Sequence, residues 1–345
     1  MSAAIEIALN AVIVAVTEEE PRLLAVHAAG STLALPSGPL DAERDRTLEL
    51  ALGAWVRAQT GVELGYVEQL YTFGNRYRDP RERSGGPRVL SIAYLALVRE
   101  APLAREAGAN WAAPVWGHCY DFLPWEDWRD GRPAILEREI APALERWVRS
   151  GGDRAATSAR RERADIFFGL GGAPWNGERV LDRFELLYEV GLVEESNRDA
   201  SPQSLTPASA PGQVTEHPNA FPGQPPAGEG SGRLGLPLAL DHRRLLASAL
   251  GRLRGKLRYR PVVFELLAPA FTLLQLQRTV EALAGLRLHK QNFRRLVEQG
   301  GLVEGTGKLE AGTGGRPAEL FRFRRDVLRE RHAAGVGLPG LRAGG

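Results

Sequence analysis

The chain has 345 residues, of which 43% are hydrophobic and 25% charged, a composition typical of a globular protein and not of a disordered or membrane chain. Its single cysteine, Cys119, excludes an intrachain disulfide and a cysteine-rich zinc site and fits a reducing compartment, so we expect a cytoplasmic protein. The net charge of +2 is unevenly distributed: residues 1–240 hold 24 Lys and Arg against 33 Asp and Glu, and residues 241–330 hold 18 against 9. This contrast indicates a polyanion-binding module joined to another module, although a basic surface that serves solubility would give the same contrast.

Residues 1–150 alternate apolar runs with two helix-like stretches. The expected strands are Ile5–Val16, Arg22–His27, Thr32–Leu35, Val62–Phe73 and Val89–Val98, and the expected helices are Arg46–Gln59 and Pro133–Val148. The first run is too short to span a membrane and lacks the basic leader of a signal peptide, so no membrane partner is expected. The pattern predicts a mixed α+β domain over residues 1–150.

The middle of the chain changes in composition. Residues 151–195 are predicted to be a helical connector, with a helix from about Glu178 to Val190. Residues 196–237 are rich in Pro, Gly, Ser, Ala and Gln and have few apolar anchors, so we expect a flexible linker there. Helical periodicity returns at about Leu240, and residues 238–330 are predicted to be a second domain, followed by a disordered tail at 331–345.

Two apolar stripes separated by a glycine indicate a helix-turn-helix in this second domain. The helices are expected at Leu273–Ala284 and Leu288–Gln299, and Gly285 permits the tight turn between them. The second helix keeps polar side chains off its apolar face, and the candidate DNA contacts are His289, Lys290, Gln291, Asn292, Arg294 and Arg295. An exposed polar helix face is common in any protein, so this helix alone leaves the function open.

The segment that follows favours nucleic-acid binding. A glycine-rich loop that carries Lys308 and Arg316 lies between two expected strands, Leu302–Glu304 and Leu320–Phe323. Glycines let the backbone approach a duplex closely, and cationic side chains neutralise phosphates or enter the minor groove. We therefore predict a winged helix-turn-helix domain that binds double-stranded DNA. A winged helix that binds protein is the alternative.

The first domain contains Leu35-Pro36-Ser37-Gly38, a helix that ends Gln59-Thr60-Gly61-Val62, and a later stretch from Gln69 to Val98. These segments resemble the Nudix hydrolases, and the later stretch is similar to that of the ADP-ribose pyrophosphatase branch. Aligning the closing glycine of the Nudix motif with Gly61 puts Arg46, Trp55, Ala58 and Gln59 at the glutamate positions of the motif. Glu43 or Glu49 offers one stand-in carboxylate. Because Nudix chemistry needs clustered carboxylates to hold divalent metal ions, the sequence predicts no metal site and no catalytic activity.

The second domain contains a run from Asn292-Phe293-Arg294-Arg295 through Gly301-Leu302-Val303-Glu304 to the segment Gly314–Phe323. This run resembles the winged helix of the NrtR-type regulators, which pair a Nudix-like sensor with a DNA reader and control NAD metabolism. The long insertion and the altered Nudix motif suggest the related NadQ branch. The resemblance implies a Nudix-like α/β/α sandwich followed by a winged helix-turn-helix domain, an α+β chain overall.

The resemblance also implies a function: a repressor of NAD metabolism genes that acts as a homodimer on a DNA operator. A nucleotide effector such as NAD or ADP-ribose would occupy the old substrate cleft and change the affinity for the operator, without a required cofactor. Candidate ligand contacts are Arg57, Tyr71, Phe73, Arg78, Arg81 and Arg88, with the arginines for phosphates and the aromatic rings for adenine. Strand packing is the other interpretation of the two aromatic residues. An active Nudix hydrolase of ADP-ribose-type substrates with an accessory nucleic-acid domain is the chief alternative function.

Overall fold

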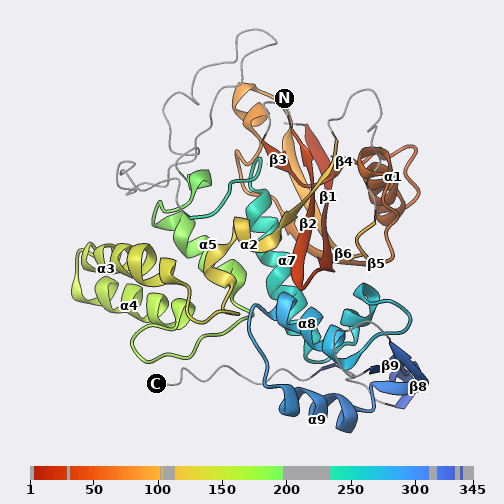
Figure 1. Cartoon of the computed structure of the whole chain (residues 1–345). Helices are drawn as coiled ribbons and strands as arrows, with labels where there is room; N and C mark the ends of the chain where they lie inside the picture. The colour runs from red at the N-terminus through yellow and green to blue at the C-terminus, as the bar shows by residue number, and fades with distance from the viewer. Residues whose placement is uncertain are drawn as a thin grey trace.

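The computed structural model describes residues 4–28, 32–101, 103, 113–196, 234–310, 317–330 and 335–336. A mixed sheet carries helices on both faces, and a smaller helical region with a two-stranded hairpin lies at one end of the molecule (Figure 1). Most of the predicted linker 196–237 and of the predicted tail 331–345 lies outside the described residues. Within the described ranges, no helix has both the length and the apolar character needed to cross a membrane.

Over the residues that the structure describes, the sheet has seven strands and is built around a long central strand. The strands are β1 (Ile5–Thr17), β2 (Glu20–His27), β3 (Leu33–Ala34), β4 (Ser37–Pro39), β5 (Tyr66–Phe73), β6 (Arg88–Leu97) and β7 (Val115–His118). Their order is β3-β2-β1-β6-β5, with β4 paired to β1 and β7 to β2. The central pair β1–β6 is parallel, whereas β1–β2 and β5–β6 are antiparallel. Glu18 and Glu19 form the β1–β2 turn with positive φ angles of 52° and 66°, as a tight hairpin turn requires.

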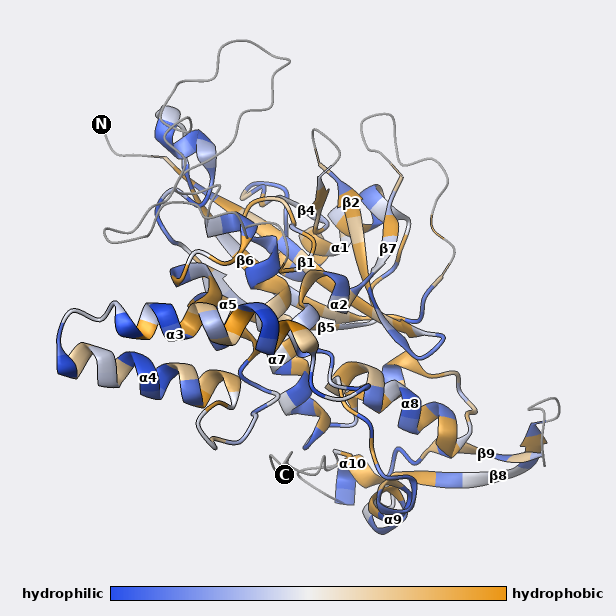
Figure 2. Cartoon of the chain, turned by 60° about the vertical axis from the view of Figure 1, so that its left-hand side comes forward, coloured by the Kyte–Doolittle hydropathy of each residue, from blue (hydrophilic) through white to orange (hydrophobic). Residues whose placement is uncertain are grey.

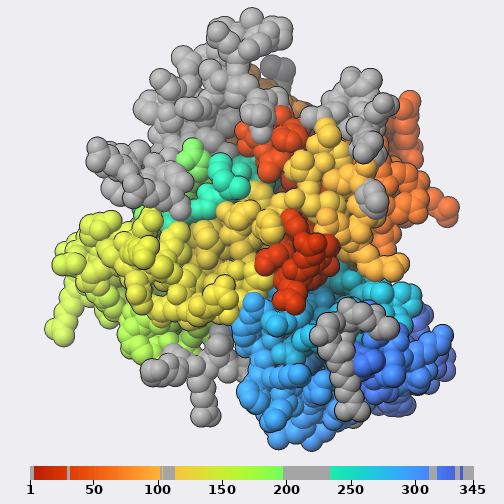
Figure 3. Space-filling view, viewed as in Figure 1, coloured from red at the N-terminus to blue at the C-terminus, as the bar shows by residue number. Residues whose placement is uncertain are grey.

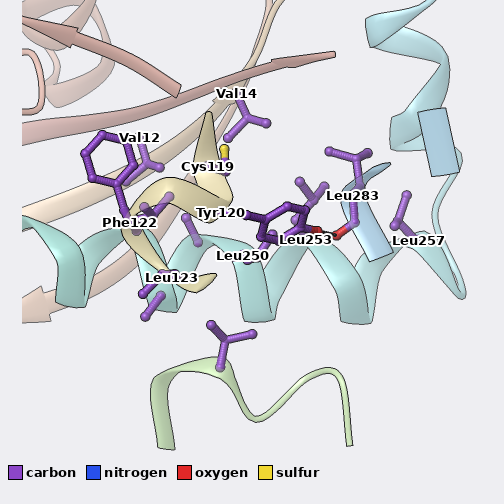
Figure 4. Packing of buried hydrophobic residues seen from close by; sticks show 14 of the residues in the cluster. Val12, Val14, Cys119, Tyr120, Phe122, Leu123, Leu250, Leu253, Leu257 and Leu283 are labelled. Carbon is purple, nitrogen blue, oxygen red and sulfur yellow. Dashed lines mark hydrogen bonds between the residues drawn. The ribbon is translucent and has the colours of Figure 1, made fainter. Parts of the chain in front are cut away.

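The alternation of side chains along β1 divides the core into two layers. Leu9 and Ile13 pack against α1 (Leu48–Thr60) on one face of the sheet. Val12 and Val14 belong to the larger cluster on the other face, together with residues of α2 (Cys119–Phe122) and α7 (His242–Leu257) (Figure 4). Successive side chains of a strand point to opposite faces, so a strand buried on both sides reads as a continuous apolar run.

Helices that follow the sheet in the chain enlarge the hydrophobic core on the face covered by α2 and α7. They are the 3-10 helix η3 (Pro124–Glu126), the π-helix η4 (Leu136–Ile140), α3 (Ala141–Arg149), α4 (Arg154–Phe168) and α5 (Val180–Glu189). α3 and α4 lie side by side and project from the body of the molecule (Figures 1 and 2). α5 packs along α7, so the segment between the sheet and α7 is joined to the main core.

The C-terminal region contains the predicted winged helix. Its elements are the 3-10 helix η6 (Val262–Leu266), α8 (Leu273–Ala284), α9 (Lys290–Gly300), β8 (Val303–Glu310), β9 (Ala318–Phe323) and α10 (Val327–Glu330). The preceding helix α7 falls inside the predicted second domain, 238–330, but it contacts β1, β5, β6 and α5 as well as α8. One apolar cluster therefore runs from the sheet through α7 into the winged helix.

Several elements were not anticipated from the sequence, among them β4, β7 and α4. β4 contains a glycine and ends at Pro39, with Pro36 directly before it, a composition that reads as a turn, and β7 has only four residues. α4 buries only Ala164 and Phe168, so its sequence has almost no apolar stripe. That helix is instead delimited by its caps: Asp153 accepts a hydrogen bond from the Ala156 amide, and Gly169 ends it in the left-handed conformation.

Candidate DNA-binding surface and ligand pocket

The helix-turn-helix is formed by α8, the turn at Gly285 and α9. α8 begins with a capping box in which Thr272 and Gln275 satisfy each other's backbone amides. Gly285 ends it with a φ of 69°, a conformation that costs residues with a Cβ about 1–2 kcal/mol. α9 buries only Phe293 and Val297 completely. The local sequence thus anchors α9 through one narrow stripe and leaves most of its circumference in solvent.

The exposed side of α9 holds the predicted contact residues. All six lie in solvent: His289, Lys290, Gln291, Asn292, Arg294 and Arg295. No acidic residue lies in the first turn, where the positive end of the helix dipole favours anions. Lys290, Arg294 and Arg295 make no ion pair with another described residue. Their charges are therefore available to an external polyanion.

The hairpin β8–β9 extends away from the body beside α9 (Figure 2). Lys308 is exposed on β8 next to Gly307, whose φ is 72°, and a register shift separates the Gly305 and Leu309 pairs. Arg316, the other predicted contact of this hairpin, lies outside the described residues. The strands are longer than the sequence indicates, because they continue into the glycine-rich stretch. α9 and the hairpin both lie in the C-terminal part at one end of the molecule (Figures 1 and 3).

The positions aligned with the Nudix motif make specific contacts between α1 and β4. The Gln59 side chain accepts a hydrogen bond from the Ser37 amide (3.1 Å) and donates one to the Ser37 carbonyl (2.6 Å). The indole of Trp55 donates to the carbonyl of Pro39 (2.9 Å) and covers Gly38 so closely that a Cβ there would lie 2.1 Å from the ring. Among the described residues, no group of three His, Cys, Asp or Glu side chains could hold a metal ion.

Two of the four arginines predicted to contact a ligand form exposed ion pairs. The side chain of Arg57 lies 3.1 Å from Glu63, and both are largely in solvent. Arg81 pairs with Asp79 (2.9 Å) and with Glu6 (3.1 Å), and its hydrogen bonds to these carboxylates raise the pKa of the guanidinium. Both charges are thus already compensated by neighbouring carboxylates.

The other two arginines have internal partners. Arg78 is buried, with 4% of its side chain exposed, and its Nε donates to Asp241 at the start of α7 (3.2 Å). Although burial alone would raise it, the pKa of the Asp241 carboxyl is held below its ordinary value by Arg78 and Arg244. Arg88 donates to the Gly74 carbonyl (2.8 Å). The four predicted arginines therefore do not gather around one site.

The predicted aromatic residues lie next to a pocket. Tyr71 and Phe73 meet edge to face on β5, with ring centroids 6.4 Å apart. Tyr71 lines a pocket of about 300 Å³ between β5, α5 and α7, and Phe73 does not. The lining consists of Tyr71, Glu178, Leu181, Asp182, Ser248, Gly251, Arg252, Gly255 and Tyr259. Except for Tyr71, sequence reasoning missed these residues, although the small residues at 248, 251 and 255 share one helix face and signal close approach of another element.

A buried ionic cluster connects this region with the helix-turn-helix. Glu126, fully buried, accepts hydrogen bonds from Arg183 of α5 (2.6 and 2.8 Å) and from Arg254 of α7 (2.6 Å). Although burial would raise it, the pKa of the Glu126 carboxyl is lowered by these two guanidinium groups. Arg254 also donates to the Leu283 carbonyl near the end of α8 (3.2 Å). The cluster therefore joins η3, α5, α7 and α8.

Tyrosine and backbone groups complete the attachment of α8. The hydroxyl of Tyr120 donates to the Ala282 carbonyl (2.6 Å), and burial raises the pKa of this hydroxyl to about 12. The Trp128 amide donates to the Gly285 carbonyl (2.7 Å). Figure 4 shows Tyr120 between α7 and Leu283. The turn of the helix-turn-helix is thus fixed directly to residues that cover the sheet.

Comparison with known proteins agrees with this arrangement. A family model described as the NrtR DNA-binding winged helix domain matches residues 263–323. A curated relative from Acinetobacter baylyi, named ADPR responsive transcriptional repressor NtrR, is 43% identical over 90 residues, which cover 26% of this chain and 36% of the relative. The match thus spans about a third of that relative's length.

Two crystal structures of Shewanella oneidensis NrtR have the same fold. The complex with a 27mer DNA gives a TM-score of 0.52 at 20% identity and covers 94% of this chain and 95% of that one. A second NrtR structure gives a TM-score of 0.50 at 21% identity, with coverage of 93% and 95%. The C-terminal segment is therefore similar to the NrtR winged helix, and the whole chain has the fold of Shewanella oneidensis NrtR.

Proposed function

We propose that this protein is a DNA-binding transcriptional regulator that represses genes of NAD metabolism. The observation that carries the proposal is the exposed face of α9, whose polar and cationic side chains lie beside the hairpin β8–β9 within the segment matched by the NrtR winged helix. A helix of this kind enters the major groove while an adjacent hairpin contacts the backbone or minor groove.

The side chains divide into base-reading and phosphate-binding groups. Arg294 and Arg295 can each donate two hydrogen bonds to guanine, and Gln291 and Asn292 can pair with adenine. His289, Lys290, Lys308 and Arg316 serve the phosphates, whose neutralisation provides affinity but no sequence selectivity. A reader of this size needs two half-sites for adequate selectivity, so we propose that the protein binds its operator as a homodimer.

The Nudix-like domain acts in this proposal as a sensor and not as an enzyme. Its motif places Arg46, Trp55, Ala58 and Gln59 at the glutamate positions, and these residues do not fit a magnesium site, since hard cations prefer oxygen ligands. Gln59 uses both of its amide atoms on Ser37, and Trp55 covers Gly38. The surface that would have held metal and pyrophosphate is instead a packed contact.

A nucleotide of the NAD or ADP-ribose type is the proposed effector. Support comes from the curated relative, which is named as responsive to ADPR. The effector would act by its different affinity for the DNA-competent and DNA-incompetent states. Of the predicted ligand contacts, Tyr71 lines a pocket, whereas each of the four arginines, Arg57, Arg78, Arg81 and Arg88, already has a partner within the chain.

Titration of the protein onto a labelled duplex from its own promoter region tests the proposal. We expect Arg294→Ala and Arg295→Ala each to weaken binding by about 1–3 kcal/mol, because each removes a guanidinium that reads a base. The matched control is Arg149→Ala, which removes an exposed arginine of α3 that pairs with Glu145. The helices α3 and α9 lie apart in both views (Figures 1 and 2). Circular dichroism verifies that every variant is folded.

The salt concentration provides a second readout. Binding of the wild-type protein should weaken steeply as salt rises, because phosphate contacts release counterions. Unchanged affinity of both α9 variants, or a flat response to salt, would refute DNA binding through this face. Turnover of ADP-ribose or NADH with Mg²⁺ at an ordinary enzymatic rate would refute the inactive sensor.

A further inference from the structure

The pocket between α5 and α7 has the size of a small-molecule site. Its volume of about 300 Å³ lies at the lower end of the range for small-molecule sites, about 300–1,000 Å³. Gly251 and Gly255 allow the segment before α5 to approach α7: a Cβ at Gly251 would lie 2.7 Å from the Glu178 carbonyl oxygen, and one at Gly255 would lie 3.3 Å from the Glu178 carboxylate. The two helices thus enclose the site closely at one side.

Ser248 supplies an unused hydrogen-bonding group to this pocket. It is 3% exposed, it lines the cavity, and its hydroxyl has no hydrogen-bond partner among the described residues. Buried polar atoms are almost always paired, since leaving one unpaired costs free energy. A ligand atom in the cavity would satisfy this hydroxyl.

One cationic side chain of the lining is available to an anion. The two acidic residues are already compensated, Glu178 by Arg258 (2.9 Å) and Asp182 by Arg179 (3.0 Å). Arg252 makes no ion pair with another described residue, and its guanidinium carbon lies 5.9 Å from the Tyr71 ring centroid. The uncompensated charge at the pocket is therefore positive and lies beside an aromatic ring.

The aromatic residues at the pocket favour a ligand with a planar ring that can stack on them. Tyr71 is 52% exposed and Tyr259 is 41% exposed, although both line the cavity. Such rings offer stacking surfaces, and the carboxylates of Glu178 and Asp182 can accept hydrogen bonds from sugar hydroxyls. We propose that this pocket binds a 5′-nucleotide, with the phosphate at Arg252, the base on the tyrosines and Ser248 as a hydrogen-bonding partner. The cavity accommodates one nucleotide unit, either free or as half of a larger molecule.

Occupancy of the pocket can reach the DNA-binding surface through Arg254. This residue lies on α7 beside the pocket residues and donates to the Gly177 carbonyl (3.1 Å), immediately before Glu178 in the pocket wall. It also donates to the Leu283 carbonyl near the end of α8. A ligand that changes the spacing of α5 and α7 therefore changes the position of the helix-turn-helix relative to α7. This regulatory step rests on the proposed function, whereas binding of the nucleotide does not.

Calorimetric titration of the full-length protein in the absence of DNA tests the site. The probes are AMP, ADP-ribose, adenosine and ribose 5-phosphate, which separate a free nucleotide, a nucleotide half, the ring and the anion. We expect AMP or ADP-ribose to bind at least about tenfold more tightly than adenosine and ribose 5-phosphate, because only the first two combine a charge-assisted hydrogen bond with stacking.

Two pocket variants and one control sharpen the test. Arg252→Gln should weaken binding of the nucleotide by about tenfold or more, since it removes the charge, and Arg149→Gln should not change it. Ser248→Ala should weaken binding by about two- to tenfold, yet leave the unliganded protein equally or more resistant to urea because an unpaired buried hydroxyl is removed. Loss of both stability and binding in Ser248→Ala would overturn the role of this hydroxyl.

The two proposals fail in different ways. If no probe binds, or if Arg252→Gln and Ser248→Ala bind as well as wild type, the pocket assignment is wrong, whatever the result with DNA. If the wild-type protein does not bind its promoter duplex, the regulator assignment is wrong, while nucleotide binding can still be measured. A nucleotide that binds with the predicted dependence on Arg252 but leaves DNA affinity unchanged would overturn the coupling through Arg254.

Discussion

Gln59, which the alignment above places at a glutamate position of the Nudix motif, makes a structural contact between α1 and β4. Its amide nitrogen donates to the Ser37 carbonyl, a hydrogen bond that a carboxylate cannot make. We expect Gln59→Glu to lower the free energy of unfolding by about 1–3 kcal/mol, because two acceptors would then face each other. Urea denaturation measures the change.

The adjacent Ala58 supplies the control for this substitution. Ala58→Glu introduces the same carboxylate one residue earlier, on the exposed side of α1. It should change the stability by no more than about 0.5 kcal/mol. Equal effects of the two substitutions would mean that the Gln59–Ser37 contact contributes nothing to stability.

Glu126 is the single carboxylate between two buried guanidinium groups, and this makes the fold sensitive to acid. Glu126→Gln should cost about 3–5 kcal/mol at neutral pH, since it leaves Arg183 and Arg254 without a buried counter-charge. Because the folded-state pKa of Glu126 lies below the ordinary value of 4.5, its contribution is complete above that value and is lost as the pH falls below it. The wild-type protein should therefore lose the stabilisation by Glu126 in acid, and Glu126→Gln should lack this pH-dependent part of the free energy of unfolding.

A surface pair provides the comparison for Glu126. Glu304→Gln breaks the exposed pair with Arg322 in the hairpin and should cost about 0–1 kcal/mol. Urea unfolding of the three proteins between neutral pH and about pH 3.5 measures both effects. Parallel pH profiles for wild type and Glu126→Gln would contradict the assignment.

At the residue scale, sequence patterns predicted which side chains are exposed better than which residues they contact. The apolar stripe of α9 implied which side chains face solvent, because helical periodicity is local. The partners of the predicted arginines were invisible, since Arg78 pairs with Asp241, 163 residues away along the chain. For the same reason, the pocket residues of α7 could not be connected with Tyr71.

Among the elements, the turn between α8 and α9 is one that requires a glycine. Gly285 has a positive φ, and a Cβ there would lie 2.4 Å from the Glu126 carbonyl oxygen and 2.5 Å from Arg254. We expect Gly285→Ala to cost more than the about 1–2 kcal/mol of a left-handed residue alone, and to weaken DNA binding because α8 must shift. Thermal unfolding and duplex titration measure the two effects.

Gly172 is the control for Gly285, because a substitution there strains the backbone without a steric clash of the added Cβ. It has a φ of 89° but nothing within 4 Å of an added Cβ. Gly172→Ala should therefore show only the backbone cost and leave DNA affinity unchanged. If Gly285→Ala is no worse than Gly172→Ala in either measurement, the turn is not fixed by its contact with Glu126.

The elements predicted best were those with strong local signals. The bounds of α8 agree with the sequence because a capping residue and a C-terminal glycine delimit a clear apolar stripe. β4 and β7 escaped detection because each is a short strand that depends on its pairing partner, and α4 escaped because it buries only Ala164 and Phe168 and so has almost no apolar stripe. The hairpin β8–β9 was predicted too short, since glycines in its strands read as loop.

At the scale of the whole molecule, α7 determines where the domains divide. Its buried residues Leu245, Leu246, Leu250, Leu253 and Leu257 belong to the cluster on the large face of the sheet. Each contributes about 1.5–3 kcal/mol by burial, so their joint loss is comparable to the about 5–15 kcal/mol that stabilises a typical domain. We therefore expect a fragment of residues 1–196 to lack cooperative unfolding and a fragment of residues 1–262 to retain it.

Urea titration followed by tryptophan fluorescence distinguishes these fragments. A sharp transition in the shorter fragment would mean that α7 belongs with the winged helix, as the predicted boundary at 238 has it. The sequence could not place α7, because its apolar pattern shows that it is buried but not against which partner. Its arginines also bear on the charge contrast: Arg243, Arg244 and Arg254 are buried and paired, so part of the basic surplus lies inside the molecule.

The way α8 is attached also determines how readily the sequence of the helix-turn-helix can change. Tyr120, Trp128 and Arg254 hold it through the main-chain oxygens of Ala282, Gly285 and Leu283. Main-chain oxygens are present whatever the side chains are, so apart from the glycine in the turn this joint places little demand on the sequence of the helix. In the proposed regulator, the exposed residues of α9 that select the operator can therefore change while the contacts that attach α8 to the sheet and to α7 stay the same.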